Sequence, residues 1–579
     1  MTSYKAAAIQ FEPTMFEKGR NIEVLLREVD TAARAGARLI VTPEMGTTGY
    51  CWLNRAEVAP FVETVPGPTT ERFAALARVH DCLIVIGMPE VDPASDLYYN
   101  SAVLIGPDGV IGTHRKSHPY ISEPKWAASG ATHQVFETKF GKIALLVCMD
   151  IHFIETARLV ALKGADVICH VSNWLAERTP APYWITRAVE NGCYLIESNR
   201  YGLERTVQFS GGSCIIEPDG TLAAVVDDGP GIAYATIDLA RTQARRHVLG
   251  HPVFEQRRPE LYMELATTTF AWNPLDFFGL YGLEPLPPGR RTKIAAAQFT
   301  PGTDLARNLE RIETLATQAR EGGAELVVFP HLALTGRPGG RESALPRDAA
   351  AIQKLMALAT RLRLDLVVSL AEAAGAKIYI TTLIIGAAGI RASYRQTHLT
   401  EAERAWATPG QDWTVIDLPL GRVGILSGHD ASFPEAGRVL ALRGCDLIVL
   451  PAAIESGFVA GHPGSQVRQN YPIPTGADLH HWHLFRARAG ENNCFLAFAN
   501  IGASPSGQAG KSGVFGPDTF EFPRREAIVP DGEGLAIAEI DTTNVAPPYP
   551  TNIIRRKDLV TMRLPHHYAP LVGRPWNSQ

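Results

Sequence analysis

The sequence predicts an α/β fold that is built twice along the chain. Three observations support this prediction: the length, the composition and an internal repeat. Domains hold roughly 100 to 200 residues, so a chain of 579 residues predicts at least two of them. With 46% hydrophobic and 20% charged residues, the composition is typical of a soluble globular protein and argues against a disordered or fibrous chain.

Charge and cysteine usage narrow the class of partner. The formal net charge of −5 leaves no broad basic surface for nucleic acid or an anionic membrane, so we expect a small-molecule partner. No apolar run approaches the roughly 20 residues that span a bilayer, which favours a cytoplasmic protein. The eight cysteines never form a Cys-x-x-Cys motif, so we expect neither a metal site nor a disulfide framework.

The repeat is visible from the first strand-like segment onward. Residues 7–11 read Ala-Ala-Ile-Gln-Phe, and residues 295–299 read Ala-Ala-Ala-Gln-Phe. An amphipathic helix is predicted after each segment, because apolar residues recur there at helical spacing. We expect Asn21 and Asn308 to cap the two helices, and a glycine follows the end of each.

The later segments repeat in the same order. Residues 37–43 and 324–330 are β-rich runs that end in proline, and residues 141–147 correspond to residues 421–427. Turn sequences such as Gly106-Pro107-Asp108-Gly109 separate further strand-like runs. Each half of the chain is therefore expected to alternate helices with strands and to include hairpins.

The two repeats define the predicted domains. We expect a first domain over residues 1–268 and a second over residues 292–579. Residues 269–291 are rich in proline and read as the linker between them.

Three reactive side chains of the first repeat stand where predicted strands end. Glu44 follows the proline after one strand, Lys116 follows a second, and Cys148 ends a third. Catalytic groups of α/β sheets collect at such strand ends. A carboxylate such as Glu44 could take the proton of the Cys148 thiol as it attacks a carbonyl, and Lys116 could stabilise the negative oxygen that forms. Glu123 could hold the lysine and the leaving group in register.

These residues form three recognisable motifs. Pro43-Glu44, Arg115-Lys116 with Glu123 downstream, and Cys148-Met149-Asp150 resemble the signatures of the nitrilase superfamily of carbon–nitrogen hydrolases, in an amidase-like branch. The resemblance covers nearly the whole chain, twice. It implies an α-β-β-α sandwich for each repeat and a Glu-Lys-Cys triad with an auxiliary glutamate. It also implies hydrolysis of amides or related C–N bonds without a cofactor.

The second repeat departs from the triad at each position. His331 stands in place of Glu44, Gln396 in place of Lys116 and Gly428 in place of Cys148, so we expect a degenerate, non-catalytic domain. Single-domain members of the superfamily commonly pair through a helix-covered face. We therefore expect the second domain to act as a covalently attached partner in an intrachain pseudo-dimer, with a higher homo-oligomer left open.

The residues after the nucleophile bear on the substrate. Superfamily members that act on substrates with a free carboxylate tend to carry arginine three or four residues past the cysteine, where this chain has Ile151 and His152. An uncharged or aromatic amide is therefore favoured, although Arg158, Arg187 and Arg200 leave a carboxylate substrate open. The candidate substrate-binding residues, whose aromatic members could equally be ordinary packing, are Tyr50, Trp52, Trp126, Met149, His152, Asn173 and Trp174.

The expected function is that of a cysteine-dependent amidase. It would hydrolyse a small carboxamide to a carboxylic acid and ammonia or an amine through a thioester. A nitrilase, an N-carbamoyl hydrolase or an acyl transferase on the same triad remains an alternative. A protein in which both repeats are inert, serving as a binding scaffold, is the non-enzymatic alternative.

Overall fold

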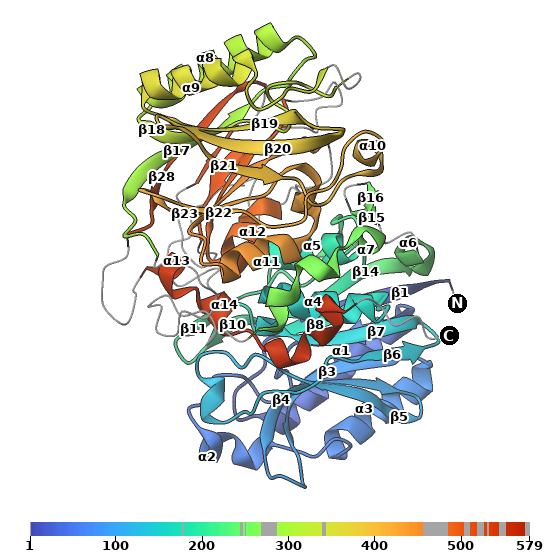
Figure 1. Cartoon of the computed structure of the whole chain (residues 1–579). Helices are drawn as coiled ribbons and strands as arrows, with labels where there is room; N and C mark the ends of the chain where they lie inside the picture. Colours follow the sequence, from blue (N-terminus) through green and yellow to red (C-terminus); the bar gives the residue numbers. More distant parts are fainter. Residues whose placement is uncertain are drawn as a thin grey trace. The chain divides into compact units, whose positions relative to one another are not determined.

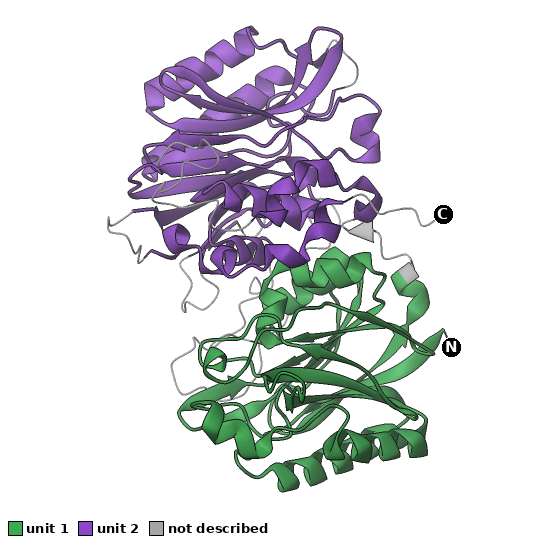
Figure 2. Ribbon diagram, turned by 60° about the horizontal axis from the view of Figure 1, so that its bottom comes forward, with its two compact units in different colours: residues 1–248, 458–484 green, residues 249–457, 485–579 purple. Residues whose placement is uncertain are grey.

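The chain forms two compact units, which a computed structural model describes (Figure 1). Unit 1 comprises residues 1–248 and 458–484, and unit 2 comprises residues 249–457 and 485–579 (Figure 2). The described residues are 2–175, 179–243, 247–248, 250–267, 286–338, 343–455, 484–502, 510–517, 526–529, 532–543 and 552–573. Most of the predicted linker, residues 268–285, lies outside them.

The first sheet of unit 1 has six strands in the order β14-β1-β2-β3-β4-β5. The central strands β1, β2 and β3 pair in parallel, and the outer pairings are antiparallel. Parallel strands buried on both faces need apolar runs, and β2 has one at Leu39-Ile40-Val41. The bounds are β1 (Ser3–Gln10), β2 (Ala37–Val41), β3 (Leu83–Val91), β4 (Tyr98–Gly106), β5 (Gly109–Arg115) and β14 (Gly231–Asp238).

The second sheet of unit 1 has the strand order β13-β12-β9-β8-β7-β6. Its central strands β7, β8 and β9 are parallel, and antiparallel strands flank them. The bounds are β6 (Val135–Thr138), β7 (Gly141–Val147), β8 (Val167–Ser172), β9 (Tyr194–Asn199), β12 (Cys214–Ile216) and β13 (Leu222–Val225). Shorter elements of unit 1 are α2 (Arg55–Val58), β10 (Tyr201–Glu204), β11 (Val207–Ser210), α6 (Leu239–Gln243) and β15 (His247–Val248).

Helices cover the outer face of both sheets, as Figure 2 shows for the green unit. Helices α1 (Lys18–Arg34) and α3 (Pro68–His80) pack on the first sheet, while α4 (Ile154–Leu162) and α5 (Pro182–Asn191) pack on the second. The inner faces meet where β1 lies against β9 and β4 against β7. This layer order confirms the predicted α-β-β-α sandwich. No helix in the described residues is long and apolar enough to cross a membrane.

Unit 2 repeats the architecture of unit 1. Its sheets have the orders β21-β20-β19-β18-β17-β28 and β22-β23-β24-β25-β26-β27. The strands are β17 (Arg291–Gln298), β18 (Ala324–Val328), β19 (Asp365–Ala374), β20 (Lys377–Gly386), β21 (Gly389–Arg395), β22 (Val415–Leu418), β23 (Gly421–Ile425), β24 (Leu447–Pro451), β25 (Phe495–Ala499), β26 (Gly513–Phe515), β27 (Ala527–Ile528) and β28 (Gly534–Asp541). The longer helices are α8 (Leu305–Glu321), α9 (Ala350–Leu362), α11 (Pro434–Leu442) and α12 (Leu484–Asn492). The tandem α/β organisation is thus confirmed.

The helix caps differ from the prediction. Helix α1 begins at Lys18, so Asn21 lies in its first turn, where its amide bonds both the N–H and the carbonyl of Thr14. Helix α8 is capped by Asp304, and Asn308 binds the preceding loop in the same way as Asn21 does. The prediction of an asparagine cap was therefore wrong. The repeated asparagine ties a helix to its incoming loop instead.

A segment after the last strand of unit 1 packs on unit 2. It contains β16 (His251–Pro252) and α7 (Val253–Gln256), and residues up to 267 follow. Tyr262 is fully buried there, and its hydroxyl hydrogen-bonds His398 Nε2 at 2.6 Å. Short helices at the other end of unit 2 are α13 (Ile553–Arg556), α14 (Asp558–Thr561) and α15 (Ala569–Val572), and α10 (Glu401–Arg404) follows β21.

Candidate active site

Cys148 lies on a tight turn at the end of β7. It opens a 3-10 turn, Cys148–His152, and its backbone φ of 43° falls in the left-handed region that side chains rarely adopt. Asp150 in the same turn accepts hydrogen bonds from the backbone N–H groups of Val147, Ser117 and His118. Because Ser117 and His118 directly follow Lys116, this one carboxylate fixes the lysine loop against the turn that carries the cysteine.

Lys116 is held between two buried carboxylates. Its Nζ lies 2.9 Å from Glu44 Oε1 and 2.6 Å from Glu123 Oε1. Both glutamates are fully buried and the lysine is 1% exposed. Burial alone would lower the pKa of Lys116, but the charges of Glu123 and Glu44 outweigh it and hold the pKa well above its usual range. The lysine is therefore an ammonium.

The pKa of Cys148 depends on the charges of Glu44 and Lys116. Burial and the charge of Glu44 raise the pKa of its thiol well above the ordinary value, while Lys116 and a hydrogen bond from the backbone N–H of Asn173 act in the opposite direction. The resting group is a neutral thiol. A nearby base must therefore take the proton while the sulfur attacks.

Asn100 on β4 was not among the predicted site residues. Its Nδ2 donates to Glu44 Oε1 at 2.6 Å and lies 3.5 Å from Glu123 Oε1, so it joins the two carboxylates that hold Lys116. No motif marks an asparagine in the middle of a strand. Comparison of the repeats supplies a signal, because the corresponding residue in β20 is Ile380.

His170 on β8 was missed as well. Its Nε2 lies 3.0 Å from the carbonyl oxygen of Cys148, and its Nδ1 bonds the carboxylate of Glu197 on β9, which Ser172 also bonds. The Cys148 carbonyl only accepts, so Nε2 carries a proton, and a carboxylate at Glu197 favours a proton on Nδ1 as well. Burial opposes this charge, yet Glu197 raises the pKa of His170. The histidine thus fixes the backbone of the predicted nucleophile.

Tyr50, Trp52 and Trp126 all lie in one buried apolar cluster of unit 1. Lys116 Nζ lies 5.8 Å from the centre of the Tyr50 ring, which brings Tyr50 to the site. Trp126 is 4% exposed, and its Nε1 has no hydrogen-bond partner among the described residues. Trp52 instead packs against Phe61, and its Nε1 donates to the carbonyl of Gly49.

The remaining predicted residues surround the turn of Cys148. Met149 and His152 are buried within it, and the His152 ring stacks on Trp174 with centroids 4.6 Å apart. Burial and the charges of Arg187 and His170 hold the pKa of His152 well below its usual range, so the ring is neutral. Asn173 is 1% exposed, and neither its Oδ1 nor its Nδ2 has a partner among the described residues.

The sequences of both repeats match one known protein family. Residues 5–247 and residues 293–547 each match the carbon–nitrogen hydrolases. The chain belongs to the carbon–nitrogen hydrolase family. It is accordingly an enzyme that hydrolyses C–N bonds other than peptide bonds, of amidase-like character.

Several relatives of this carbon–nitrogen hydrolase have one repeat where it has two. A nitrilase of Pyrococcus abyssi is 35% identical over 263 residues, which are 45% of this chain and 98% of the relative. An N-carbamoylputrescine amidase of Solanum lycopersicum is 32% identical over 287 residues, 45% of this chain and 94% of its own. The solved structure of a carbon–nitrogen hydrolase from Helicobacter pylori G27 aligns with 46% of this chain and 98% of its own, at 26% identity and a TM-score of 0.41.

The arginines left open as carboxylate receptors in this hydrolase bind internal groups. Arg187 donates to the carbonyls of Ile151 and His152 and pairs with Glu190 at 2.6 Å. Arg158 donates to the carbonyl oxygen of Glu190. Arg200 donates to Glu204, and its guanidinium lies 4.2 Å from the ring centre of Phe209.

The second repeat of the hydrolase keeps the turn but not the triad. Gly428 opens a 3-10 turn, Gly428–Ser432, with φ of 53°, and Asp430 accepts backbone hydrogen bonds from Ser427 and His398, as Asp150 does from Val147 and His118. His331 and Gln396 bond the two oxygens of Glu403, the counterpart of Glu123. The scaffold is retained where the nucleophile is absent.

Proposed function

We propose that unit 1 is a cysteine-dependent amidase that hydrolyses a small, uncharged carboxamide through a thioester. The observation that carries the proposal is the arrangement of Lys116 between Glu44 and Glu123, beside a cysteine on a left-handed turn. A cation between two carboxylates supplies both a base and a fixed positive charge to one small volume.

The first half of the reaction forms the thioester. Glu44 takes the proton of Cys148 as the sulfur attacks the amide carbon, and the carbonyl electron pair moves to the oxygen. Lys116 and a backbone N–H at the turn stabilise this oxyanion. When the oxyanion collapses, the C–N bond breaks and the nitrogen takes the proton from Glu44. Ammonia or an amine leaves, and the acyl group stays on Cys148.

The second half releases the acid. A water molecule loses a proton to Glu44 as its oxygen attacks the thioester carbon. The C–S bond then breaks, and the sulfur regains a proton from Glu44. Glu123 holds Lys116 in place throughout, because its contact with the ammonium is independent of the proton that Glu44 carries.

The surroundings favour a carboxamide over a nitrile or a carboxylate. The buried side chain of Asn173 offers an acceptor and a donor that have no partner among the described residues. A carboxamide can satisfy both, whereas a nitrile or a carboxylate only accepts hydrogen bonds. The neutral His152 supplies no charge for a carboxylate. Because two relatives are named nitrilase and N-carbamoylputrescine amidase, nitriles and carbamoyl compounds remain the alternative substrates.

A substrate panel tests the proposal. Ammonia release is measured for nitriles, primary amides and N-carbamoyl compounds, with mass spectrometry of Cys148. We expect amides to react fastest, an acyl adduct on Cys148, and a loss of roughly 1,000-fold or more in Cys148→Ala. Cys51→Ala, a half-buried cysteine, is the matched control and should stay active.

Other outcomes would replace the proposal. Faster release from nitriles or carbamoyl compounds would change the substrate class, and a product that depends on added hydroxylamine would indicate acyl transfer. The absence of both turnover and adduct with every substrate would favour the inert scaffold. Full hydrolysis by Cys148→Ala would contradict the mechanism itself.

A further inference from the structure

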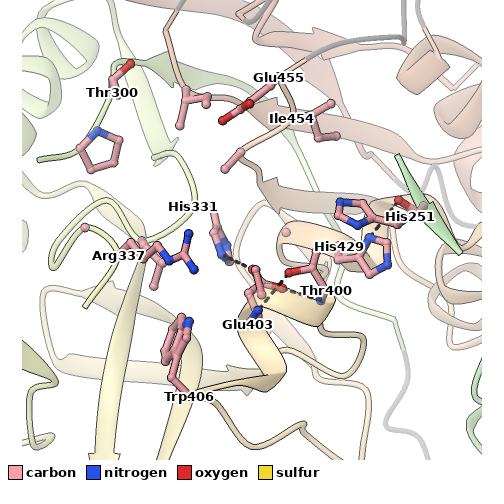
Figure 3. A pocket seen from close by; sticks show the side chains of 18 residues that line it. His251, Thr300, His331, Arg337, Thr400, Glu403, Trp406, His429, Ile454 and Glu455 are labelled. Atoms are coloured by element: carbon pink, nitrogen blue, oxygen red, sulfur yellow. Dashed lines mark hydrogen bonds and ion pairs between the residues drawn. The ribbon is translucent and has the colours of Figure 1, made fainter. Parts of the chain in front are cut away.

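Unit 2 contains a cavity at the place where unit 1 has its proposed catalytic centre. The cavity has a volume of about 550 Å³, and its lining includes His331, Glu403 and Gly428, the counterparts of Glu44, Glu123 and Cys148 (Figure 3). Small-molecule sites have volumes in this range. The lining residues all belong to unit 2.

The cavity of unit 2 cannot carry out the reaction proposed for unit 1. A Cβ atom built on Gly428 would lie 2.7 Å from Gln396 Oε1 and 2.8 Å from His331 Cε1. The replacements at the other two triad positions therefore occupy the space of the nucleophile. The cavity in front of them remains, so a ligand there would be bound and not transformed.

The carboxylate that corresponds to the auxiliary Glu123 already has hydrogen-bond partners. Glu403 accepts hydrogen bonds from His331 Nε2 at 3.1 Å, from Gln396 Nε2 at 3.1 Å and from the backbone N–H of Thr400 at 2.8 Å. Burial alone would raise the pKa of Glu403, but the hydrogen bond and charge of His331 outweigh it and lower the pKa to about 2. Glu403 is thus a carboxylate with its own partners.

Arg337 places a positive charge at the cavity where unit 1 has Tyr50. The turn Thr335-Gly336-Arg337 corresponds to Thr48-Gly49-Tyr50, with the same threonine hydroxyl bond to the glycine carbonyl. Arg337 makes no hydrogen bond or ion pair within the described part of the chain, and its guanidinium points towards His331 in Figure 3. A guanidinium fork matches a carboxylate or a phosphate.

The rest of the lining distinguishes between these two anions. Glu403 and Glu455 both line the cavity, and their negative charges oppose a dianion such as phosphate. The apolar lining side chains Leu332, Trp406, Ile454 and Ile501 can contact a hydrocarbon body. A carboxylate on an apolar body satisfies both features.

We propose that the cavity of unit 2 is a non-catalytic binding site for a small monocarboxylate, whose carboxylate is held by Arg337. Binding does not depend on the reaction of unit 1. If unit 1 is an amidase as proposed, its acid product belongs to the same chemical class, and the second repeat would then sense product.

Calorimetry on the full chain tests this site. Cys148→Ala serves as the parent so that no ligand is turned over, and benzoate, benzamide and inorganic phosphate are the probes. Arg337→Gln should weaken benzoate binding roughly tenfold or more and leave benzamide binding unchanged, and Arg337→Lys should be intermediate. Arg361→Gln, an exposed arginine of the same unit, is the matched control and should bind benzoate like the parent.

Each other result would overturn the proposal. Benzoate that does not bind at millimolar concentration, or that binds equally well to Arg337→Gln, would show that Arg337 holds no carboxylate. An equal loss of benzamide binding would show that charge is not recognised. Phosphate that competes as well as benzoate would indicate a general anion site. Because binding is measured without turnover, these results are independent of the amidase proposal.

Discussion

At the scale of single residues, the buried charges of unit 1 depend on one another. An ammonium as deeply buried as Lys116 would lose its proton without partners, and two carboxylates as close as Glu44 and Glu123 would repel each other without the ammonium. Burial and the charge of Glu44 raise the pKa of Glu123, while Lys116 opposes that rise. Glu123 is therefore the group of this cluster whose protonation we expect to change first as pH falls.

We predict that Glu123 determines the acid side of the pH profile. Its raised pKa means that, as pH falls, it takes up a proton at a pH above the ordinary glutamate value of 4.5 and releases its hold on Lys116. The acid limb of kcat/KM should lie above that pH and shift to lower pH in Glu123→Gln. We also expect kcat/KM of this variant to fall roughly 10- to 100-fold.

Glu71→Gln, an exposed glutamate of the same unit, is the control for this measurement and should keep both rate and profile. An acid limb that stays in place in Glu123→Gln would show that another group determines it.

Some residues around Cys148 could be predicted from the sequence, and others could not. Glu44, Lys116 and Cys148 stand at strand ends, where the sequence has motifs. Asn173 directly follows β8 and was predicted, whereas Asn100 acts from a position that is ordinary in sequence and reaches the site through its bond to Glu44. A comparison of the repeats separates their roles, because polar residues of the scaffold such as Asp150 persist in unit 2 and these two do not.

At the scale of elements, the strands beside Cys148 also carry polar residues that unit 2 lacks. In unit 1, β8 and β9 carry the buried polar group His170, Ser172 and Glu197. The corresponding residues of unit 2, at or next to β24 and β25, are apolar: Leu450, Ala452 and Phe498. A sandwich of this kind therefore folds without the polar group. Its presence beside Cys148 is explained by the bond from His170 to the cysteine carbonyl.

We predict opposite effects of partial and complete replacement on these strands. His170→Leu alone leaves Glu197 buried without its cation, which should lower the free energy of unfolding by about 3 to 5 kcal/mol. The triple variant His170→Leu, Ser172→Ala, Glu197→Phe copies unit 2 and should regain most of that loss. Its kcat should still be roughly 10- to 100-fold lower than that of the unchanged protein, because the carbonyl of Cys148 has lost its hydrogen bond from His170.

Chemical denaturation and initial rates, together with the rate of Cys148 alkylation by iodoacetamide, measure both effects. A triple variant with normal kcat and normal alkylation would show that His170 serves stability alone.

Helix boundaries were harder to predict than strands. The β-rich runs ending in proline correspond to β2 and β18, because each strand has three consecutive buried apolar residues, 39–41 and 326–328. Asparagine is favoured at helix N-caps, yet Asn21 and Asn308 bind the preceding loop from within the first helical turn. The side chain is suited to both tasks, and only the path of the incoming loop decides between them.

At the scale of the whole molecule, the boundary between the units has a structural basis. The sequence places residues up to 268 with the first domain, and the contacts place residues 250–267 with unit 2. There Gln256 Oε1 lies 2.6 Å from His429 Nε2, Arg257 pairs with Glu435 at 3.0 Å and Glu264 pairs with Arg443. A linker search by proline content cannot detect such packing.

We predict that unit 2 requires this segment. A fragment of residues 249–579 should unfold at higher denaturant concentration than one of residues 269–579, because the shorter fragment loses the buried Tyr262 and the pair of Arg257 with Glu435. The loss should be several kcal/mol, as for a large buried aromatic side chain alone. Circular dichroism against denaturant measures it, and equal midpoints would contradict the assignment of the segment.

The same division places residues 1–248 in unit 1 together with residues 458–484, and a fragment of residues 1–248 tests the proposal that the second repeat is an attached partner. We expect this fragment alone to associate or to lose activity, since it lacks that partner. A fully active monomer in sedimentation and rate measurements would contradict the proposal.

The backbone torsion shared by Cys148 and Gly428 has an evolutionary consequence. A side chain at such a φ costs about 1 kcal/mol, and glycine removes that cost, so a duplicated copy released from selection gains stability when it loses its sulfur. Once His331 and Gln396 have filled the vacated volume, a reverted cysteine would collide with both. Loss of the cysteine thus removes a backbone strain from the second repeat, and a return to cysteine would require His331 and Gln396 to change as well.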